Sequence, residues 1–213
     1  MIKSEIRSMV LNHLQKWDST SKYHARFLDA AIESVIKELY WELFAIDPHA
    51  IQRYLVRYGV ASAIAVTYNN TLGFYTSTLP AAIVPLPDKA SGCRRISTIA
   101  QSGLTFFPMD AREFDLVGSS SYVDTVTSKI GYVVNQTTVD YYGMTAAIAA
   151  VGVRMDILQT FSAYADTDTV LLPELVIEGG ITFLDRVLKT LRQIPPVEQI
   201  DSNADEIQTK EQK

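Results

Sequence analysis

The first quarter of the chain has a helical pattern of apolar positions. One apolar stripe runs through residues 2–17, and a longer one runs through residues 23–44 and includes Phe27. Apolar residues at steps of three and four place one face of each helix against a core. Asp47-Pro48 closes the second stripe, because a residue before proline disfavours helical geometry. The pattern predicts an N-terminal helical hairpin, followed by a further helical turn over residues 49–58.

From Val60 onward the apolar period shortens to about two residues, which is typical of strands. Short candidate strands then follow one another about every ten residues, a spacing that favours an antiparallel β-sandwich or a barrel-like region. Residues 147–160 alternate like a strand, although their alanine-rich start would also suit a helix. The expected strands are 60–68, 72–76, 81–86, 95–99, 104–107, 122–127, 130–135, 139–142 and 147–160.

The C-terminal part combines a helix with a polar tail. Leu172-Pro173-Glu174 is typical of a helix start, and Pro195-Pro196 ends the helix. Residues 198–213 hold five acidic and two basic residues and few apolar ones. Such a segment cannot bury enough surface to fold alone. It is either a frayed tail or an arm that orders against a partner, with Ile200 and Ile207 on one helical face.

These patterns predict an α+β protein with one main domain. We expect a helical region at 1–58, a β-rich region packed on the helices at 59–170, a C-terminal helix at 171–196 that completes the same domain, and a flexible tail or assembly arm at 197–213. No apolar run approaches the ~20 residues that cross a bilayer, and the chain starts without a basic cluster and apolar stretch. A cytoplasmic protein without a membrane segment is therefore expected.

Charge and composition argue against several functions. The net charge is −5, and residues 154–213 hold eleven acidic and six basic residues, whereas nucleic-acid binding normally needs a basic face. The three histidines all precede residue 50, outside any metal-ligand spacing. The single cysteine, Cys93, excludes an internal disulfide. Arg94 and Arg95 beside it could make the thiol reactive, although entry into a strand is favoured. We therefore expect neither catalytic residues nor a cofactor or metal.

A resemblance to a known family comes from three features in a fixed order. The string Thr78-Leu-Pro-Ala-Ala-Ile-Val-Pro-Leu-Pro-Asp88 leads through Gly92 into the strand 94–99, between a helical opening and the late Leu172-Pro173-Glu174 helix. This arrangement resembles the head-to-tail connector proteins of tailed bacteriophages, most closely the ring or adaptor proteins of crAss-like phages. The resemblance covers residues 29–191. It departs from the pattern at Ala90-Ser91, which lengthens the turn before Gly92.

The resemblance implies a non-enzymatic virion protein of the neck, assembled in the host cytoplasm. Twelve copies would form a closed ring around the channel between portal and tail, through which genomic DNA passes without sequence-specific binding. The portal protein and neighbouring tail or ring proteins would be the other partners. The acidic excess of the chain agrees with a surface past which DNA slides.

Four residues are candidates for assembly contacts: Tyr141, Tyr142, Ile200 and Ile207 are large and lie in segments with little local core to join. Two other functions remain open. A ligand- or carbohydrate-binding β-sandwich of a phage tail would stack exposed tyrosines and tryptophans on sugar rings, but both tryptophans fall in the helical part. A hydrolase that uses Ser121 or Asp124 would need a motif that the sequence lacks.

Overall fold

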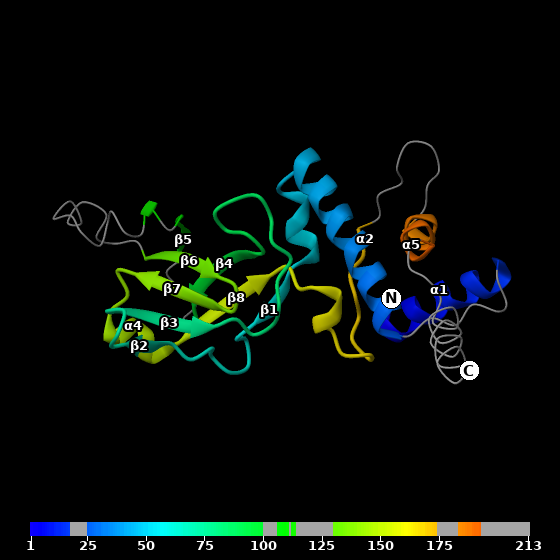
Figure 1. Ribbon diagram of the computed structural model, residues 1–213. Coiled ribbons are helices and arrows are strands. Elements are labelled where there is room, and N and C mark those ends of the chain that lie inside the picture. Colours follow the sequence, from blue (N-terminus) through cyan, green and yellow to red (C-terminus); the bar gives the residue numbers. More distant parts are fainter. Residues whose placement is uncertain (18–24, 100–105, 111, 114–129, 174–182, 193–213) are drawn as a thin grey trace, which may run out of the picture. The chain divides into compact units, whose positions relative to one another are not determined.

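The computed structural model describes residues 1–17, 25–99, 106–110, 112–113, 130–173 and 183–192. The chain is a mixed α+β protein and divides into two compact units (Figure 1). The helical unit comprises Met1–Pro48 and Phe161–Lys213, and the β unit comprises His49–Thr160. The boundaries therefore fall after residues 48 and 160, and not after 58 and 170 as the sequence suggested. The β unit is an insertion between two parts of the helical unit.

The helical unit contains α1 (Lys3–Trp17), α2 (Ala25–Ile46), a 3-10 turn η3 (Phe161–Ala163) and α5 (Phe183–Leu191). Helix α5 packs against both α1 and α2. The apolar stripes predicted from the sequence form most of this core. Its buried members include Ile6, Val10, Leu14, Leu28, Ile32, Val35, Ile36, Leu39, Tyr40, Val187, Leu188 and Leu191.

Residues 161–170 belong to the helical unit because the start of the chain holds them. Ile2 forms a β-bridge with Thr169, and the backbone amide of Lys3 donates to the carbonyl of Asp168 at 3.0 Å. The Lys3 ammonium is buried and donates to the carbonyl of Tyr164 at 2.7 Å. A buried ammonium costs free energy unless it is hydrogen-bonded, so these contacts explain how Lys3 can be buried in α1.

The β unit begins with a 3-10 turn, η1 (Ala50–Tyr54), and contains a three-stranded antiparallel sheet in the order β1-β8-β4. Its strands are β1 (Val56–Tyr58), β8 (Val153–Ile157) and β4 (Cys93–Thr98). Asp156 on the central strand lies opposite Arg57 on one side and Arg95 on the other. The pairing of β1 with β8 assigns residues 49–58 to this unit.

The second sheet has five strands in the order β2-β3-β7-β6-β5. These strands are β2 (Thr67–Asn69), β3 (Phe74–Thr78), β7 (Thr138–Tyr142), β6 (Gly131–Asn135) and β5 (Phe107–Pro108). All pairs are antiparallel except β5 with β6, which is parallel. Among the described residues neither sheet closes into a barrel, so the barrel-like alternative is wrong.

Side chains from both sheets belong to one buried cluster. The Tyr132 hydroxyl on β6 donates to the carbonyl of Cys93 on β4 at 2.8 Å and so connects the two sheets. Tyr141 lies in the same cluster with its ring edge-on to Phe106. The cluster comprises Leu79, Cys93, Ile96, Phe106, Ile130, Tyr132, Val139, Tyr141, Met144, Ala149, Val153, Met155 and Ile157.

Three predicted strands differ from the structure. Residues 60–66 make only one bridge, between Ile64 and Val153, and regular pairing starts at Thr67. Residues 81–86 contribute a single bridge from Ile83 to Gln159, because prolines on both sides limit the amides available for a ladder. Residues 147–160 contain both elements that the pattern allowed: helix α4 (Ala146–Val151) and strand β8, separated by Gly152.

Candidate functional site

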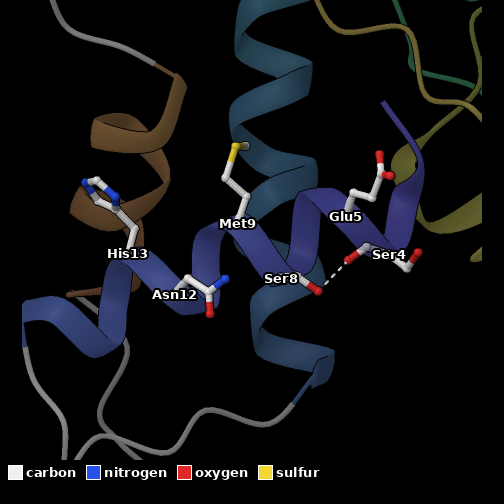
Figure 2. Close-up of a pocket in the computed structure, with 6 residues that line it drawn as sticks. All are labelled: Ser4, Glu5, Ser8, Met9, Asn12 and His13. Atoms are coloured by element: carbon white, nitrogen blue, oxygen red, sulfur yellow. Dashed lines mark hydrogen bonds between the residues drawn. The ribbon is translucent and has the colours of Figure 1, made fainter.

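A shallow hollow of about 480 Å³ lies along one side of α1 (Figure 2). Its six lining residues all come from this helix: Ser4, Glu5, Ser8, Met9, Asn12 and His13. The Ser8 hydroxyl donates to the Ser4 carbonyl at 2.9 Å, a bond within the helix itself. His13 is half-buried on this face, as the apolar stripe suggested. Because every described lining residue comes from one helix, the part of the chain that the structure describes places no second element there to orient a substrate, and these residues alone have little capacity for catalysis.

A second hollow, of about 580 Å³, lies along α2 beside Ser162. Ion pairs and hydrogen bonds hold three of its charged residues: the Glu33 carboxylate accepts from Lys37 at 2.6 Å and from the Ser162 amide at 3.1 Å, and Arg7 from α1 pairs with Asp29. Burial favours the protonated form of Glu33, but the bonds from Lys37 and Ser162 outweigh it and lower the pKa of this carboxyl. These pairs join η3 and α1 to α2, so they act within the fold.

The third hollow, of about 490 Å³, lies on the three-stranded sheet and is rich in arginine. We call its lining the arginine surface; it consists of Gln52, Leu55, Arg57, Arg94, Arg95 and Asp156. The strand register explains the centre of this surface, because Asp156 lies between Arg57 and Arg95 on neighbouring strands. Directly opposite residues on adjacent strands lie within contact distance of each other. The sheet therefore places two arginines opposite one aspartate, and Arg57 is the one whose guanidinium pairs with its carboxylate.

A β-bulge adds the third arginine. The pairing of β4 with β8 shifts between Cys93 and Arg95, so that Arg94 is the extra residue. Consecutive residues of a regular strand point to opposite faces, whereas a bulge redirects one of them. Both Arg94 and Arg95 consequently line the same hollow. The adjacent arginines were visible in the sequence, but the bulge that brings them to one surface was not.

The ion pairs leave positive charge at the arginine surface. The Asp156 carboxylate, whose side chain is 9% exposed, accepts from Arg57 through two bonds, Nε to Oδ1 at 2.7 Å and Nη2 to Oδ2 at 3.1 Å. Arg94 pairs with Asp88. Within the part of the chain that the structure describes, Arg95 has no ion-pair partner, and it is exposed. Such an arrangement can bind an anionic group but contains no nucleophile with an adjacent base.

Cys93 begins β4 beside these arginines and is completely buried. Burial, together with the charge of Asp156, raises the pKa of its thiol to about 12. The side chain belongs to the buried cluster that residues of both sheets form, where burial excludes the water that would stabilise a thiolate. The alternative of a reactive thiol is therefore not supported.

We expect Cys93 to resist alkylation in the folded protein. A rise from 9.0 to about 12 lowers the thiolate fraction near neutral pH by about a thousandfold, and burial also blocks access. The measurement is the rate of reaction with iodoacetamide at pH 8, with and without denaturant. Denatured chain, in which the same thiol is exposed, is the control. Modification of native protein at the denatured rate would contradict this assignment.

The structure changes the status of the predicted interface residues. Tyr141 is 1% exposed, and its hydroxyl forms a 2.7 Å bond with Ser77, so it is a core residue and its selection as a surface contact is wrong. Tyr142, the next residue of β7, is partly exposed and stays a prediction. Ile200 and Ile207 lie outside the described residues, as do Ser121 and Asp124.

Sequence reasoning missed an outer stripe on α2 with two exposed aromatic residues, which we define as Phe27, Ala30, Ser34, Glu38, Trp41 and Ala45, all exposed. Phe27 is 38% exposed and Trp41 50% exposed, so Phe27 does not belong to the core stripe to which the periodicity assigned it. The sequence signal was Trp41, a large aromatic residue that lies off the core-facing stripe. An exposed apolar patch of this kind often marks a contact with another protein.

No group of three or more His, Cys, Asp or Glu side chains suited to a metal ion occurs among the described residues. None of the helices in this part of the chain is long and apolar enough to cross a membrane. Comparison with protein-family models, with curated proteins and with solved structures finds no match to this chain.

Proposed function

We propose that this chain is a structural subunit of a closed ring in the head-to-tail connector of a tailed bacteriophage. The proposal assigns it no catalysis, no cofactor and no membrane contact. Its partners are other copies of the chain, the portal protein and neighbouring tail or ring proteins, with genomic DNA passing through the ring. Assembly in the host cytoplasm and a final place in the virion neck belong to the same proposal.

The outer stripe of α2 is the observation that carries this proposal. A helix on the surface of a monomer normally presents charged and polar residues to water. Between Phe27 and Trp41 the outer stripe instead has Ala30 and Ser34, with Glu38 as its one charged residue. Small side chains between two aromatic ones let another element approach closely and cover the rings. Contact of this stripe with a different face of the next copy would repeat from copy to copy, and such a contact closes a ring when the rotation per copy divides a full turn.

The β unit has exposed apolar side chains of its own. Val60, Tyr68, Leu72 and Val151 are each about half exposed or more. We propose that its two sheets form a β-sandwich and that this unit contacts the neighbouring components of the connector. Standard protein interfaces have an apolar centre with aromatic residues, which agrees with this set.

One feature favours the alternative of a carbohydrate-binding module. Tyr68 on β2 is 52% exposed and lies edge-on to Tyr75 at a ring distance of 5.1 Å. Exposed aromatic rings can stack on sugars. Trp41, the tryptophan whose side chain is described, belongs to the helical unit, whereas this tyrosine pair belongs to the β unit, so the ring proposal remains the better supported one.

The test is imaging of the purified chain by negative stain, together with its mass in solution by light scattering. We expect rings with an axial hole wide enough for duplex DNA, formed either by the chain alone at high concentration or after addition of purified portal protein. A stable monomer that fails to associate with the portal would contradict the proposal. Retention of that monomer on a glycan array would instead support the carbohydrate-binding alternative.

A further inference from the structure

The arginine surface has exposed guanidinium groups that can bind an anion. Arg57 is tied to Asp156, yet its side chain is 54% exposed. Arg95 faces the same hollow from the other side of Asp156 and has no ion-pair partner among the described residues. Leu55 adds an apolar group to the lining. The geometry therefore suits a ligand with carboxylate groups next to an apolar side chain.

The charges favour carboxylates of a peptide over the phosphates of a nucleic acid. Phosphate backbones are bound by concentrated positive fields that displace counterions. Here Asp156 lies between two of the arginines, and Asp88 pairs with the third, so the positive excess is small and local. Single guanidinium groups with planar donor pairs match single carboxylates well.

The chain itself contains a segment that has both carboxylates and apolar side chains. Residues 197–213 hold five acidic and two basic residues. Asp201 and Asp205 are four residues apart, a spacing that would bring both carboxylates to one face of a helix, and Ile200 directly precedes Asp201 in the sequence. The segment thus combines paired carboxylates with apolar residues, which complements Arg57, Arg95 and Leu55.

We propose that the arginine surface of one copy binds the acidic C-terminal segment, residues 197–213, of the neighbouring copy in the ring. Asp201 and Asp205 would pair with the guanidinium groups at Arg57 and Arg95, while an isoleucine covers Leu55. This inference rests on the proposed ring and names one of its joints. A contact in which the segment and its receiving surface are different parts of the chain repeats from copy to copy, as a ring requires.

Charge reversal in the full-length chain tests the joint. We expect R95E alone, and D201K/D205K alone, each to weaken ring formation by about tenfold or more, because each places like charges together. A one-to-one mixture of the two variants should restore assembly. In the mixture the unchanged tail of R95E meets the unchanged surface of D201K/D205K, and the reversed tail meets the reversed surface. R112E, an equal charge change at an exposed arginine outside the surface, is the matched control.

Ring yield is measured against protein concentration. The circular dichroism melt of each variant is measured as well, and this melt should equal that of the wild type. Wild-type ring yield from R95E would overturn the inference while the ring proposal stands. Impaired single variants that mixing fails to rescue would overturn the contact between copies. Weaker binding of R95E to a short DNA duplex at low salt, with unchanged rings, would identify the surface as a nucleic-acid site instead.

A second measurement keeps the two proposals separable. A fluorescent peptide of residues 197–213 is titrated into the full-length wild type and into R95E, with fluorescence anisotropy as the signal. We expect binding to the wild type and about tenfold weaker binding to R95E. If the chain forms no ring even with the portal, the peptide titration still shows whether the arginine surface binds residues 197–213. Equal binding of the peptide to both proteins would overturn it.

Discussion

Replacement of Gly152 by alanine is expected to destabilise the β unit by about 3 kcal/mol or more. Gly152 ends α4 with φ +74° and ψ 177°, a conformation that is almost exclusive to glycine. An added Cβ would lie 2.6 Å from the Ala63 Cβ and 2.9 Å from the Ile64 carbonyl oxygen. Ile64 is held there by two backbone hydrogen bonds with Val153, so the backbone has little room to retreat.

Gly73 offers a matched control for this substitution. Its φ is +77°, close to that of Gly152, but nothing lies within 4 Å of an added Cβ. Gly73→Ala should therefore cost only about 1 kcal/mol, the intrinsic penalty of the left-handed region. Hydrogen exchange of the β8 amides follows the β unit, and tryptophan emission follows the helical unit, because Trp17 and Trp41 both lie there. Equal stability of the two variants would contradict the close approach at Gly152.

Replacement of Trp41 by glutamate is expected to abolish ring formation while the monomer stays folded. Trp41 is 50% exposed on the outer stripe of α2, so its loss should cost the isolated chain about 1 kcal/mol or less. A buried tryptophan at an interface typically contributes 2 kcal/mol or more, so that each contact should weaken by about thirtyfold. Because the same contact occurs between every pair of neighbouring copies, the loss of affinity recurs at each contact of the ring.

The effect is measured as ring yield by negative stain and as mass by light scattering. Folding of the variant is followed by circular dichroism, because the substitution itself removes a tryptophan. Gln15→Glu, which adds the same charge at an exposed position of α1, is the control and should leave ring formation unchanged. Rings of normal yield from the Trp41→Glu protein would remove the outer stripe from the proposed contact. Loss of the cooperative melt would show instead that Trp41 supports the monomer fold.

The helical elements could be predicted because their apolar periodicity is local. Helices α1 and α2 lie where the stripes placed them, and Val10 and Leu39 are buried as expected. The strands around 95–99, 130–135 and 139–142 also appear, each within a few residues. The strand expected at 122–127 lies outside the described residues. Where the pattern was ambiguous, at 147–160, a single glycine with positive φ separates a helix from a strand.

The candidate site could be predicted only in part, because exposure depends on distant partners. Tyr141 looked like a surface residue, but the pairing of β7 with β3 brings it to Ser77 and into the core. Phe27 looked like a core residue, but α2 turns it outward. Neither outcome follows from the neighbours of the residue in sequence, since both are decided by which element packs on which face.

The amino-acid order by itself determined the α+β class, the positions of the two long helices and the excess of acidic residues toward the C-terminus, because each depends on residues close together in the chain. Tertiary structure decided the division into two units, in which β1 joins a strand about a hundred residues away. It also decided the arginine surface, because only the register of three strands and one bulge brings Arg57, Arg94 and Arg95 together around Asp156. Long-range pairing is chosen by the whole fold, and no local pattern encodes it.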